Sequence, residues 1–423
     1  MTATMHSPWD RLETRSADER ETALLSALPS VVQAAKALPG WAASLADIDP
    51  AAINTRAALT ALPVLRKNEL QALQQAESGN DPFAGLSALG WRRLGAARRA
   101  RRVFQSPGPI YEPESAATDY WRAARALHAA GFAAGDLVHN SFSYHLTPGA
   151  WIMESGAQAL GCTVFPGGVG NSELQLQAMR DLQPDGYVGT PSFLRILLEK
   201  AEQIQLALPG LKKALLSGEA FPAALRDWLA QRGVQAYQAY ATADLGLVAY
   251  ETSAREGLVL DEGVILEIVR PGTGDPVPEG EVGELVVTVL NLDYPLLRFG
   301  TGDLSAVLPG PCPTGRTNTR IKGWMGRADQ TAKVRGMFVH PSQIAEVLKR
   351  HPEASRARLV VEGEMANDRM TLHVESSSST PGLQEALAHS LRELTKLRGD
   401  VVLHAPGALA NDGRVIEDLR KLG

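Results

Sequence analysis

Cysteine is scarce in this chain of 423 residues, which contains only Cys162 and Cys312. Two cysteines are too few for a disulfide scaffold or for a cysteine-rich zinc site. Excess charge is also lacking, since 42 Lys and Arg against 47 Asp and Glu give a net charge of -5. This charge offers no global attraction to nucleic acid or to an anionic membrane, and we expect neither as a partner.

Long hydrophobic runs are missing as well. No stretch is apolar enough to span a bilayer, and the polar first residues lack the apolar core of a signal peptide. With 44% hydrophobic and 21% charged residues, the composition is that of an ordinary globular protein. We therefore expect a cytoplasmic globular protein. Its length exceeds that of one ordinary core, which predicts roughly two or three folding units.

The hydrophobic pattern changes along the chain. Residues 1–90 are typical of helices with polar joints, and residues 17–37 carry Leu and Val at helical spacing. From residue 103 to about 251, amphipathic helices alternate with short apolar strands that end in Gly, Pro, Ser or Asn: LVHNSF, CTVFPGG, GYVGTP, KKALLSGE and VQAYQAY. This alternation predicts a mostly parallel sheet with helices on both faces. Ligands bind such sheets at the carboxyl ends of the strands.

The last part of the chain has a different pattern. A β-rich stretch covers residues 258–308, and a polar linker follows near residues 322–329. The remaining residues have the order β-α-β-β-α-β. We predict an α/β protein whose large N-terminal domain has mixed or parallel sheets, helices and a β-rich subdomain. A small C-terminal α+β domain follows it.

A basic cluster, RRLGAARRARR, occupies residues 92–102. It is either a patch that faces an anion or the solvated face of a helix. Because short Arg clusters are common and the chain as a whole is acidic, we favour the solvated helix face.

Four segments gather glycines and polar residues where strands are expected to end: SGEAF (217–221), AYQAYATAD (236–244), YPLLRFGTGDL (294–304) and GRADQTAKVRGMFVHPSQI (326–344). Each is weak evidence alone. Each residue also has an ordinary structural interpretation. Tyr240 can be an aromatic residue of the core and Asp244 the cap of a helix. Asp303 can form a turn, and Arg327 can be a charge on the surface. The order and spacing of the four segments together are far more specific.

With these segments, and with WDRLETRSADERE, LTALPVLRKNEL and TPSFLRIL, the chain resembles the adenylate-forming (AMP-binding) superfamily. It is most similar to phenylacetate–CoA ligases, over nearly its whole length. The resemblance implies the acyl-adenylate synthetase fold, with a large AMP-binding domain at residues 1–327, including a helical lead at 1–90. A small domain at residues 330–423 rotates about a hinge near Asp329 between adenylation and thioester formation.

The resemblance also implies roles for individual residues. Gly218, Glu219 and Ala220 pack on the adenine, and Tyr240 stacks against it. Ala241 and Thr242 continue this nucleotide-binding motif, while Asp244 takes the place of a Glu that helps to hold Mg²⁺. Asp303 accepts hydrogen bonds from the ribose hydroxyls, and Arg327 approaches the ribose and the phosphate.

Departures from the family pattern fall on the catalytic parts. The phosphate loop corresponds to residues 103–114, where Ser106 and Gly108 remain but the run of hydroxyl residues and the Lys are absent. Backbone amides around Gly108 can still cradle phosphates, although an ordinary proline-braced loop fits as well. Ala243 lacks the hydroxyl that contacts the α-phosphate, and we expect Thr242 to compensate. Arg414 aligns with the catalytic Lys and supplies a permanent charge.

The acyl pocket of the relatives corresponds to NSFSYHLTPG and FPGGVG, where Tyr144, His145 and Gly168 are the candidate residues. The implied activity is that of an AMP-forming acid–CoA ligase which uses ATP, Mg²⁺ and CoA to activate an aromatic or similar carboxylic acid. Two alternatives stay open: an adenylating enzyme that loads a carrier protein or another nucleophile, and a catalytically degenerate nucleotide- or acyl-binding protein. A homodimer is also left open. The sequence does not identify the acid.

Overall fold

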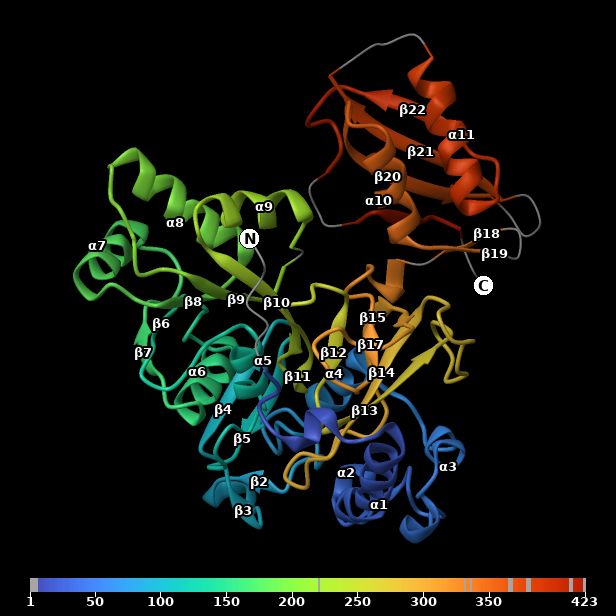
Figure 1. Cartoon of the computed structure of the whole chain (residues 1–423). Helices are drawn as coiled ribbons and strands as arrows, with labels where there is room; N and C mark the ends of the chain where they lie inside the picture. The colour runs from blue at the N-terminus through green and yellow to red at the C-terminus, as the bar shows by residue number, and fades with distance from the viewer. Residues whose placement is uncertain are drawn as a thin grey trace. The chain divides into compact units, whose positions relative to one another are not determined.

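The computed structural model describes residues 7–219, 221–330, 332–334, 337–363, 368–377, 382–410 and 414–420. The chain divides into two compact units (Figure 1). The large unit comprises Met1–Ile268, Gly274–Thr301 and Ala306–Gly323, and the small unit comprises Val269–Thr273, Gly302–Ser305 and Trp324–Gly423. Among the described residues, no helix is both long and apolar enough to cross a membrane.

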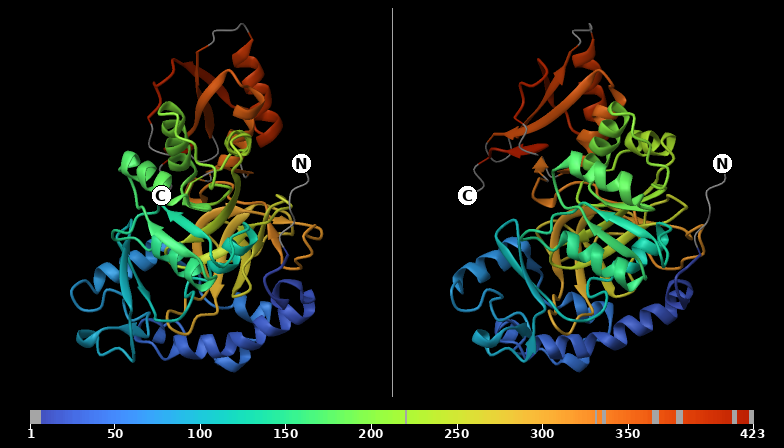
Figure 2. Two further views of the ribbon diagram at one scale, coloured as in Figure 1. Left: turned by 60° about the vertical axis from the view of Figure 1, so that its left-hand side comes forward. Right: turned by 90° about the vertical axis from the view of Figure 1, so that its left-hand side faces the viewer.

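The large unit begins with a series of helices. The longest, α1 (Ala17–Lys36), starts with a capping box, in which the Ser16 side chain and the Glu19 carboxylate each accept the other residue's amide proton. Its buried face carries the apolar residues that were expected at helical spacing, among them Leu24, Leu28 and Val31. Helix α1 contacts α2 and η2, and Figure 2 shows this helical series in blue. The other elements of this series are η1 (Arg11–Thr14), α2 (Pro39–Ala42), η2 (Pro50–Ala52), α3 (Arg56–Thr60) and α4 (Lys67–Ala76).

A nine-stranded sheet forms the centre of the large unit, with the strand order β16-β17-β12-β11-β10-β9-β8-β6-β7. Its parallel half contains the five predicted strands: β6 (Leu137–Asn140), β7 (Thr163–Pro166), β8 (Gly186–Gly189), β9 (Lys213–Leu216) and β10 (Gln235–Thr242). The antiparallel half consists of β11 (Gly246–Glu251), β12 (Leu258–Leu260), β16 (Val307–Leu308) and β17 (Arg320–Ile321).

Helices cover both faces of the parallel half, as predicted. Successive residues of a strand point to opposite faces. Val188 and Leu215 share a core with α5 (Ala124–Ala129) and α6 (Gly149–Ala159). Tyr187 and Leu216 point the other way, into a core with α7 (Ser172–Leu182), α8 (Pro191–Gln203) and α9 (Ala223–Gln231). The carboxyl ends of the five strands therefore meet at one edge of a rigid layered structure.

A second sheet of four strands has the order β1-β15-β14-β13 and packs on α1. Its strands are β1 (Leu65–Arg66), β13 (Val264–Val269), β14 (Gly283–Val289) and β15 (Phe299–Ser305). Two strand pairs lie outside both sheets: β4 (Arg102–Ser106) with β5 (Ile110–Glu114), and β2 (Leu89–Gly90) with β3 (Arg98–Arg99).

The basic cluster at residues 92–102 is not helical, which corrects the expectation of a solvated helix face. It consists of the short 3-10 turn η3 (Arg92–Leu94), then β3 and the start of β4. Gly95 ends the turn in a left-handed conformation with φ of 62°, where a helix cannot continue. Arg102 points back to the protein, since it pairs with Glu114 at 2.9 Å and stacks on the Trp151 ring at 3.8 Å.

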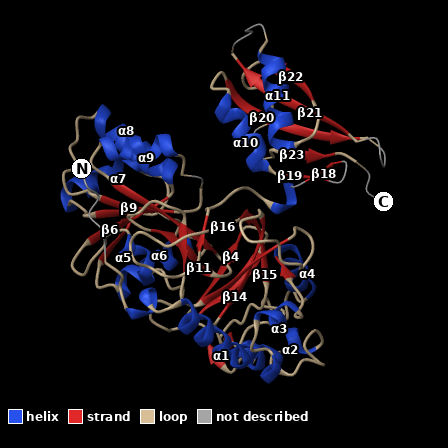
Figure 3. Ribbon diagram, turned by 45° about the vertical axis from the view of Figure 1, so that its right-hand side comes forward, coloured by secondary structure: helices blue, strands red, loops and turns tan. Residues whose placement is uncertain are grey.

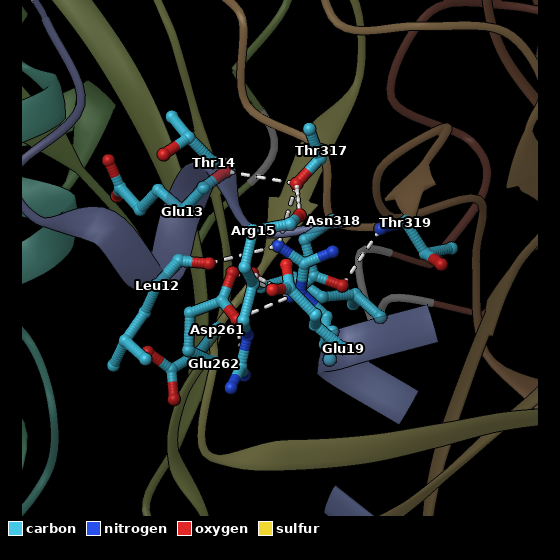
Figure 4. Close-up of polar contacts among 12 residues, drawn as sticks. Leu12, Glu13, Thr14, Arg15, Glu19, Asp261, Glu262, Thr317, Asn318 and Thr319 are labelled. Atoms are coloured by element: carbon cyan, nitrogen blue, oxygen red, sulfur yellow. Dashed lines mark hydrogen bonds and ion pairs between the residues drawn. The ribbon is translucent and has the colours of Figure 1, made fainter. Parts of the chain in front are cut away.

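Buried ion pairs fix the N-terminal segment to the large unit (Figure 4). The Glu262 carboxylate accepts hydrogen bonds from Arg15 and from Arg20, each at 2.9 Å. Glu13 is fully buried and pairs with Arg316 at 3.1 Å. The Thr317 amide donates to the Glu13 carbonyl at 2.9 Å. These contacts join residues that are far apart in the sequence. They hold η1 and the first turn of α1 against the large unit.

The small unit is an α+β structure (Figure 3). Its main sheet has the order β22-β21-β20-β23, and a separate pair joins β18 to β19. Helices α10 and α11 share one apolar core with the main sheet, which includes Leu359, Leu372 and Leu387. The elements are η4 (Ala328–Gln330), β18 (Ala332–Val334), β19 (Met337–Val339), α10 (Pro341–Arg350), β20 (Ala354–Glu362), β21 (Arg369–Ser376), α11 (Leu383–Thr395), β22 (Asp400–His404) and β23 (Ile416–Asp418).

Candidate active site

The predicted adenine-facing residues follow β9 and β10, where two neighbouring parallel strands end. Ser217 joins the two ends, because its hydroxyl donates to the Ala239 carbonyl at 2.8 Å. Gly218 has a φ of +81°, in the left-handed region that favours glycine. The Glu219 carboxylate accepts hydrogen bonds from the Ser192 hydroxyl at 2.9 Å and amide at 3.2 Å, at the start of α8. Ala220 lies outside the described residues.

Tyr240 lies near the end of β10, directly before an irregularity in the pairing of β10 with β11. Its half-buried ring packs against two apolar clusters of the large unit. Ala241 and Thr242 follow, and the Thr242 hydroxyl accepts a hydrogen bond from the Leu245 amide at 3.1 Å. This bond shapes the turn that carries Asp244 into the interior, where Asp244 is only 4% exposed.

Lys67, the first residue of α4, is the partner of Asp244. Its Nζ donates to Asp244 Oδ2 at 3.1 Å. Two further residues on the same face of α4 hold the hairpin formed by β4 and β5. The Gln71 amide donates to the Gly108 carbonyl, and the Gln74 side chain exchanges two hydrogen bonds with the Tyr111 backbone, at 2.9 and 2.7 Å. Helix α4 therefore fixes this hairpin next to Asp244.

This hairpin contains the residues that were predicted to correspond to the phosphate loop. Gly108 lies in its exposed turn, and Ser106 is buried at the end of β4. The Ser106 hydroxyl donates to Oε1 of Glu112, which is fully buried. The pKa of Glu112 is raised to about 8. Burial is the main cause, and the negative charge of Asp244 is the second.

Glu112 was missed from the sequence, although a signal was present. Residues 110, 112 and 114 of IYEPE alternate on one face of β5, and all three are buried. A strand that turns two carboxylates inward requires partners for both. Glu114 pairs with Arg102. For Glu112, the Ser106 hydroxyl is the hydrogen-bond donor to one of the two carboxylate oxygens.

The same region contains a buried phenol. Tyr294 is 2% exposed, and burial, followed by the charges of Asp244 and Glu112, raises its pKa well above the ordinary value. Within the described residues no group of three or more His, Cys, Asp and Glu side chains is arranged to hold a metal. Mg²⁺ commonly uses only one or two carboxylates and completes its shell with phosphate oxygens and water. Asp244 and Glu112 therefore fit this ion by the chemistry of their oxygens.

In the small unit, the structure brings Asp303 and Arg327 together. Asp303 Oδ1 accepts hydrogen bonds from Trp324 Nε1 at 3.0 Å and from the Arg327 guanidinium at 3.3 Å. A backbone bridge also joins Asp303 to Arg327. Gly302 has a φ of +72°, and a Cβ at this position would lie 2.7 Å from an Arg327 nitrogen. The positive φ favours glycine before Asp303, and a side chain here would displace the end of Arg327.

Asp329 lies in η4, and Arg414 lies in the segment before β23. The two segments are connected, since the Val415 amide donates to the Gln330 side chain at 2.8 Å. The Arg414 side chain is 60% exposed and lies 3.7 Å from the Glu417 carboxylate. An exposed guanidinium on a short segment is accessible to an anion.

Asn140, at the end of β6, links two of the candidate acyl-pocket residues. Its side-chain amide donates to the Tyr144 hydroxyl at 3.0 Å, and its carbonyl accepts from the Gly168 amide at 3.0 Å. The Tyr144 hydroxyl donates in turn to Glu154 at 2.7 Å. Burial and this carboxylate raise the pKa of Tyr144. His145 is exposed, whereas the neighbouring His139 is buried.

His139 is a second residue that sequence reasoning did not single out. Its Nε2 lies 2.7 Å from the Gln175 side-chain oxygen, and the Gln175 amide donates to the Gly168 carbonyl at 2.9 Å. Burial lowers the pKa of His139, so the neutral imidazole is favoured. The pair of His139 and Gln175 supports the glycine-rich turn after β7 from inside.

Comparisons with known proteins identify the family of the chain. Residues 118–291 match the AMP-binding enzyme family. The phenylacetate-coenzyme A ligase of Aromatoleum evansii is 30% identical over 366 residues, which cover 82% of this chain and 79% of the relative. The phenylacetate-coenzyme A ligase of Escherichia coli (strain K12) is 30% identical over 320 residues, which cover 71% of this chain and 72% of the relative. Among solved structures, an open conformation of 2-hydroxyisobutyryl-CoA ligase with 2-HIB-AMP and CoA superposes with a TM-score of 0.81 at 26% identity. It covers 96% of this chain and 93% of that one.

Proposed function

Because the chain belongs to the adenylate-forming superfamily, as an AMP-forming acid–CoA ligase close to the phenylacetate–CoA ligases, we propose that it activates an aromatic or similar carboxylic acid. In the first step the acid displaces pyrophosphate from ATP and forms an acyl-adenylate. In the second step the CoA thiol displaces AMP and forms the thioester. The observation that carries this proposal is the identity of 30% to a phenylacetate-coenzyme A ligase over about four-fifths of both chains.

The adenosine half of ATP is assigned to Tyr240, Gly218 and Asp303. The adenine lies against the Tyr240 ring and the backbone at Gly218, because a flat apolar surface buries the base and excludes water. Asp303 holds the ribose hydroxyls. Its carboxylate is fixed by Trp324 and Arg327, so it binds the ribose without a further loss of side-chain entropy.

The phosphate half is assigned to the region around Asp244. Mg²⁺ bound there supplies a charge that neutralises and orients the phosphate oxygens. Lys67 adds a positive charge near Asp244. The hydroxyl of Ser106 and the backbone around Gly108 lie at the end of the hairpin that replaces the family's phosphate loop.

Arg414 is the proposed charge-stabilising residue of the small unit, and Asp329 is the proposed hinge. A guanidinium remains protonated at every pH of interest, so Arg414 can contact the developing negative charge between the acid and the α-phosphate. Rotation about Asp329 then removes Arg414 and admits CoA. CoA is favoured over a carrier protein as the acceptor, because the relatives named above are CoA ligases.

Pyrophosphate release and thioester formation test the proposal directly. A panel of aryl and short branched acids is supplied with ATP, Mg²⁺ and CoA, and both products are measured. We expect pyrophosphate release that depends on the acid, followed by one CoA thioester per AMP. AMP release without any CoA thioester would redirect the proposal to another acceptor. A panel in which no acid stimulates pyrophosphate release would refute it.

A further inference from the structure

Several buried polar atoms of the described residues have no hydrogen-bond partner. Among them are three oxygens whose side chains interact with one another: Glu112 Oε2, Asp244 Oδ1 and the Tyr294 hydroxyl. The exposed fractions of these residues are 0%, 4% and 2%. An unsatisfied buried polar atom is destabilising, and native proteins contain few of them. Three in one region indicate a bound partner.

The three side chains interact electrostatically, so they belong to one cluster. Asp244 and Glu112 both raise the pKa of the Tyr294 phenol, and Asp244 raises the pKa of Glu112. The positive charge of Lys67 acts in the opposite direction on Glu112. The cluster thus has two carboxylates and one ammonium, together with a phenol.

Rigid elements hold the two carboxylates in place. Glu112 lies on β5, opposite Phe104 of β4, and its Oε1 is bound by the Ser106 hydroxyl. Asp244 lies on the turn after β10, which the Thr242 hydroxyl stabilises. The hydrogen bonds of Gln71 and Gln74 join α4 to the hairpin, while Lys67 of the same helix reaches Asp244. Sites on such fixed elements keep their geometry when a ligand binds.

We propose that Glu112 is a second carboxylate ligand of the divalent cation held at Asp244, with Oε2 of Glu112 and Oδ1 of Asp244 as the two donor atoms. This inference rests on the proposed function for the nucleotide that completes the metal's shell. Two carboxylates with phosphate and water oxygens form a common Mg²⁺ environment. Asp244 reaches one methylene less far than a Glu, and Glu112 supplies an additional oxygen from β5.

Lys67 is the counter-ion that competes with the metal. Its ammonium bonds to Asp244 Oδ2, and its side chain is 33% exposed, so it has room to move away into solvent. Loss of Lys67 and loss of Glu112 therefore have opposite effects on metal affinity. A purely structural role of either residue does not predict opposite signs.

Binding of Mn²⁺ to the intact protein tests this assignment. Free Mn²⁺ is measured by its electron paramagnetic resonance signal, first without nucleotide and then with a non-hydrolysable ATP analogue. We expect Glu112→Gln to weaken Mn²⁺ binding by about tenfold or more. We expect Lys67→Met to strengthen it. The matched control is Glu114→Gln, which removes another buried carboxylate of the same strand and leaves Mn²⁺ affinity unchanged.

Wild-type Mn²⁺ affinity in folded Glu112→Gln protein overturns the proposal, as does absence of saturable Mn²⁺ binding to the wild type in both conditions. If Glu112→Gln does not fold, Glu112→Asp replaces it, because that variant keeps a carboxylate and draws its oxygens back by one methylene. A folded Glu112→Asp with wild-type affinity then overturns the proposal. Acid-dependent pyrophosphate release is recorded separately. Its absence for every acid refutes the proposed function, while a Glu112-dependent Mn²⁺ site still supports the metal assignment.

Discussion

Glu262→Gln is expected to release the N-terminal segment from the large unit. Glu262 accepts from Arg15 and Arg20 at 2.9 Å and from Asn318 at 3.1 Å (Figure 4). The side chains of Arg20 and Glu262 are only 5% and 4% exposed, so the substitution leaves a buried guanidinium without its counter-ion. Removing one partner of a buried pair costs about 3–5 kcal/mol. We expect the lower end, about 3 kcal/mol, because Arg20 keeps its bonds to Leu12 and Thr317.

The Thr317 amide reports this release, because it donates to the Glu13 carbonyl of the segment. At about 1.4 kcal/mol per factor of ten, 3 kcal/mol makes the open state about 100-fold more populated. Hydrogen exchange at Thr317 is therefore expected to accelerate by about that factor. The matched control is Glu21→Gln, which breaks a pair with Arg56 whose side chains are 38% and 44% exposed and which costs less than about 1 kcal/mol. Equal exchange rates at Thr317 in the two variants would refute the argument.

Three further outcomes are expected. Burial lowers the pKa of His139, so its contribution to stability is complete above about pH 6.5 and is lost as the pH falls below that value. In urea unfolding measured at several pH values, His139→Gln reduces the loss of stability below about pH 6.5. The control His389→Gln, at an exposed position, does not. Gly302→Ala costs about 1–2 kcal/mol, because an alanine is strained at positive φ, and it abolishes thermal stabilisation by ATP through displacement of Arg327. Arg414→Ala lowers acid-dependent pyrophosphate release by about 100-fold without affecting ATP-induced stabilisation; wild-type release by this variant would remove Arg414 from the mechanism.

The parallel half of the central sheet was predictable because each strand is a short apolar run that ends at a turn-forming residue. Such runs are determined by local sequence, and the alternation with helices determines their direction. The strands β19 and β23 were missed. The three-residue strand β18 was predicted, so a short strand can be recognised only where its neighbours give a further signal. The cluster at residues 92–102 was assigned wrongly. Its Arg residues suit a helix, but Gly95 interrupts it.

The candidate site could be predicted only where two interacting residues lie within neighbouring motifs of the sequence. Asp303 and Arg327 are 24 residues apart, and their contact lies within segments whose order was already informative. The roles given to Tyr240, Asp303 and Arg414 still stay predictions. Lys67 and Asp244 are separated by 177 positions, and no local pattern connects a residue at the start of α4 with a turn after β10.

The absence of a lysine from the phosphate loop has a different meaning once these contacts are known. A missing positive charge in that loop suggests a degenerate site if the loop is considered alone. In the folded chain, Lys67 supplies an ammonium 3.1 Å from Asp244, and the hairpin supplies a buried carboxylate, Glu112. In the site that we propose, the positive charge lies on α4 instead of the loop, and the loop supplies a metal-binding carboxylate. A chain that had lost its phosphate chemistry has no reason to retain a buried carboxylate without a partner for one of its oxygens, because that atom costs about 1–3 kcal/mol of stability. The departures from the family pattern therefore favour a rebuilt phosphate site over a degenerate one.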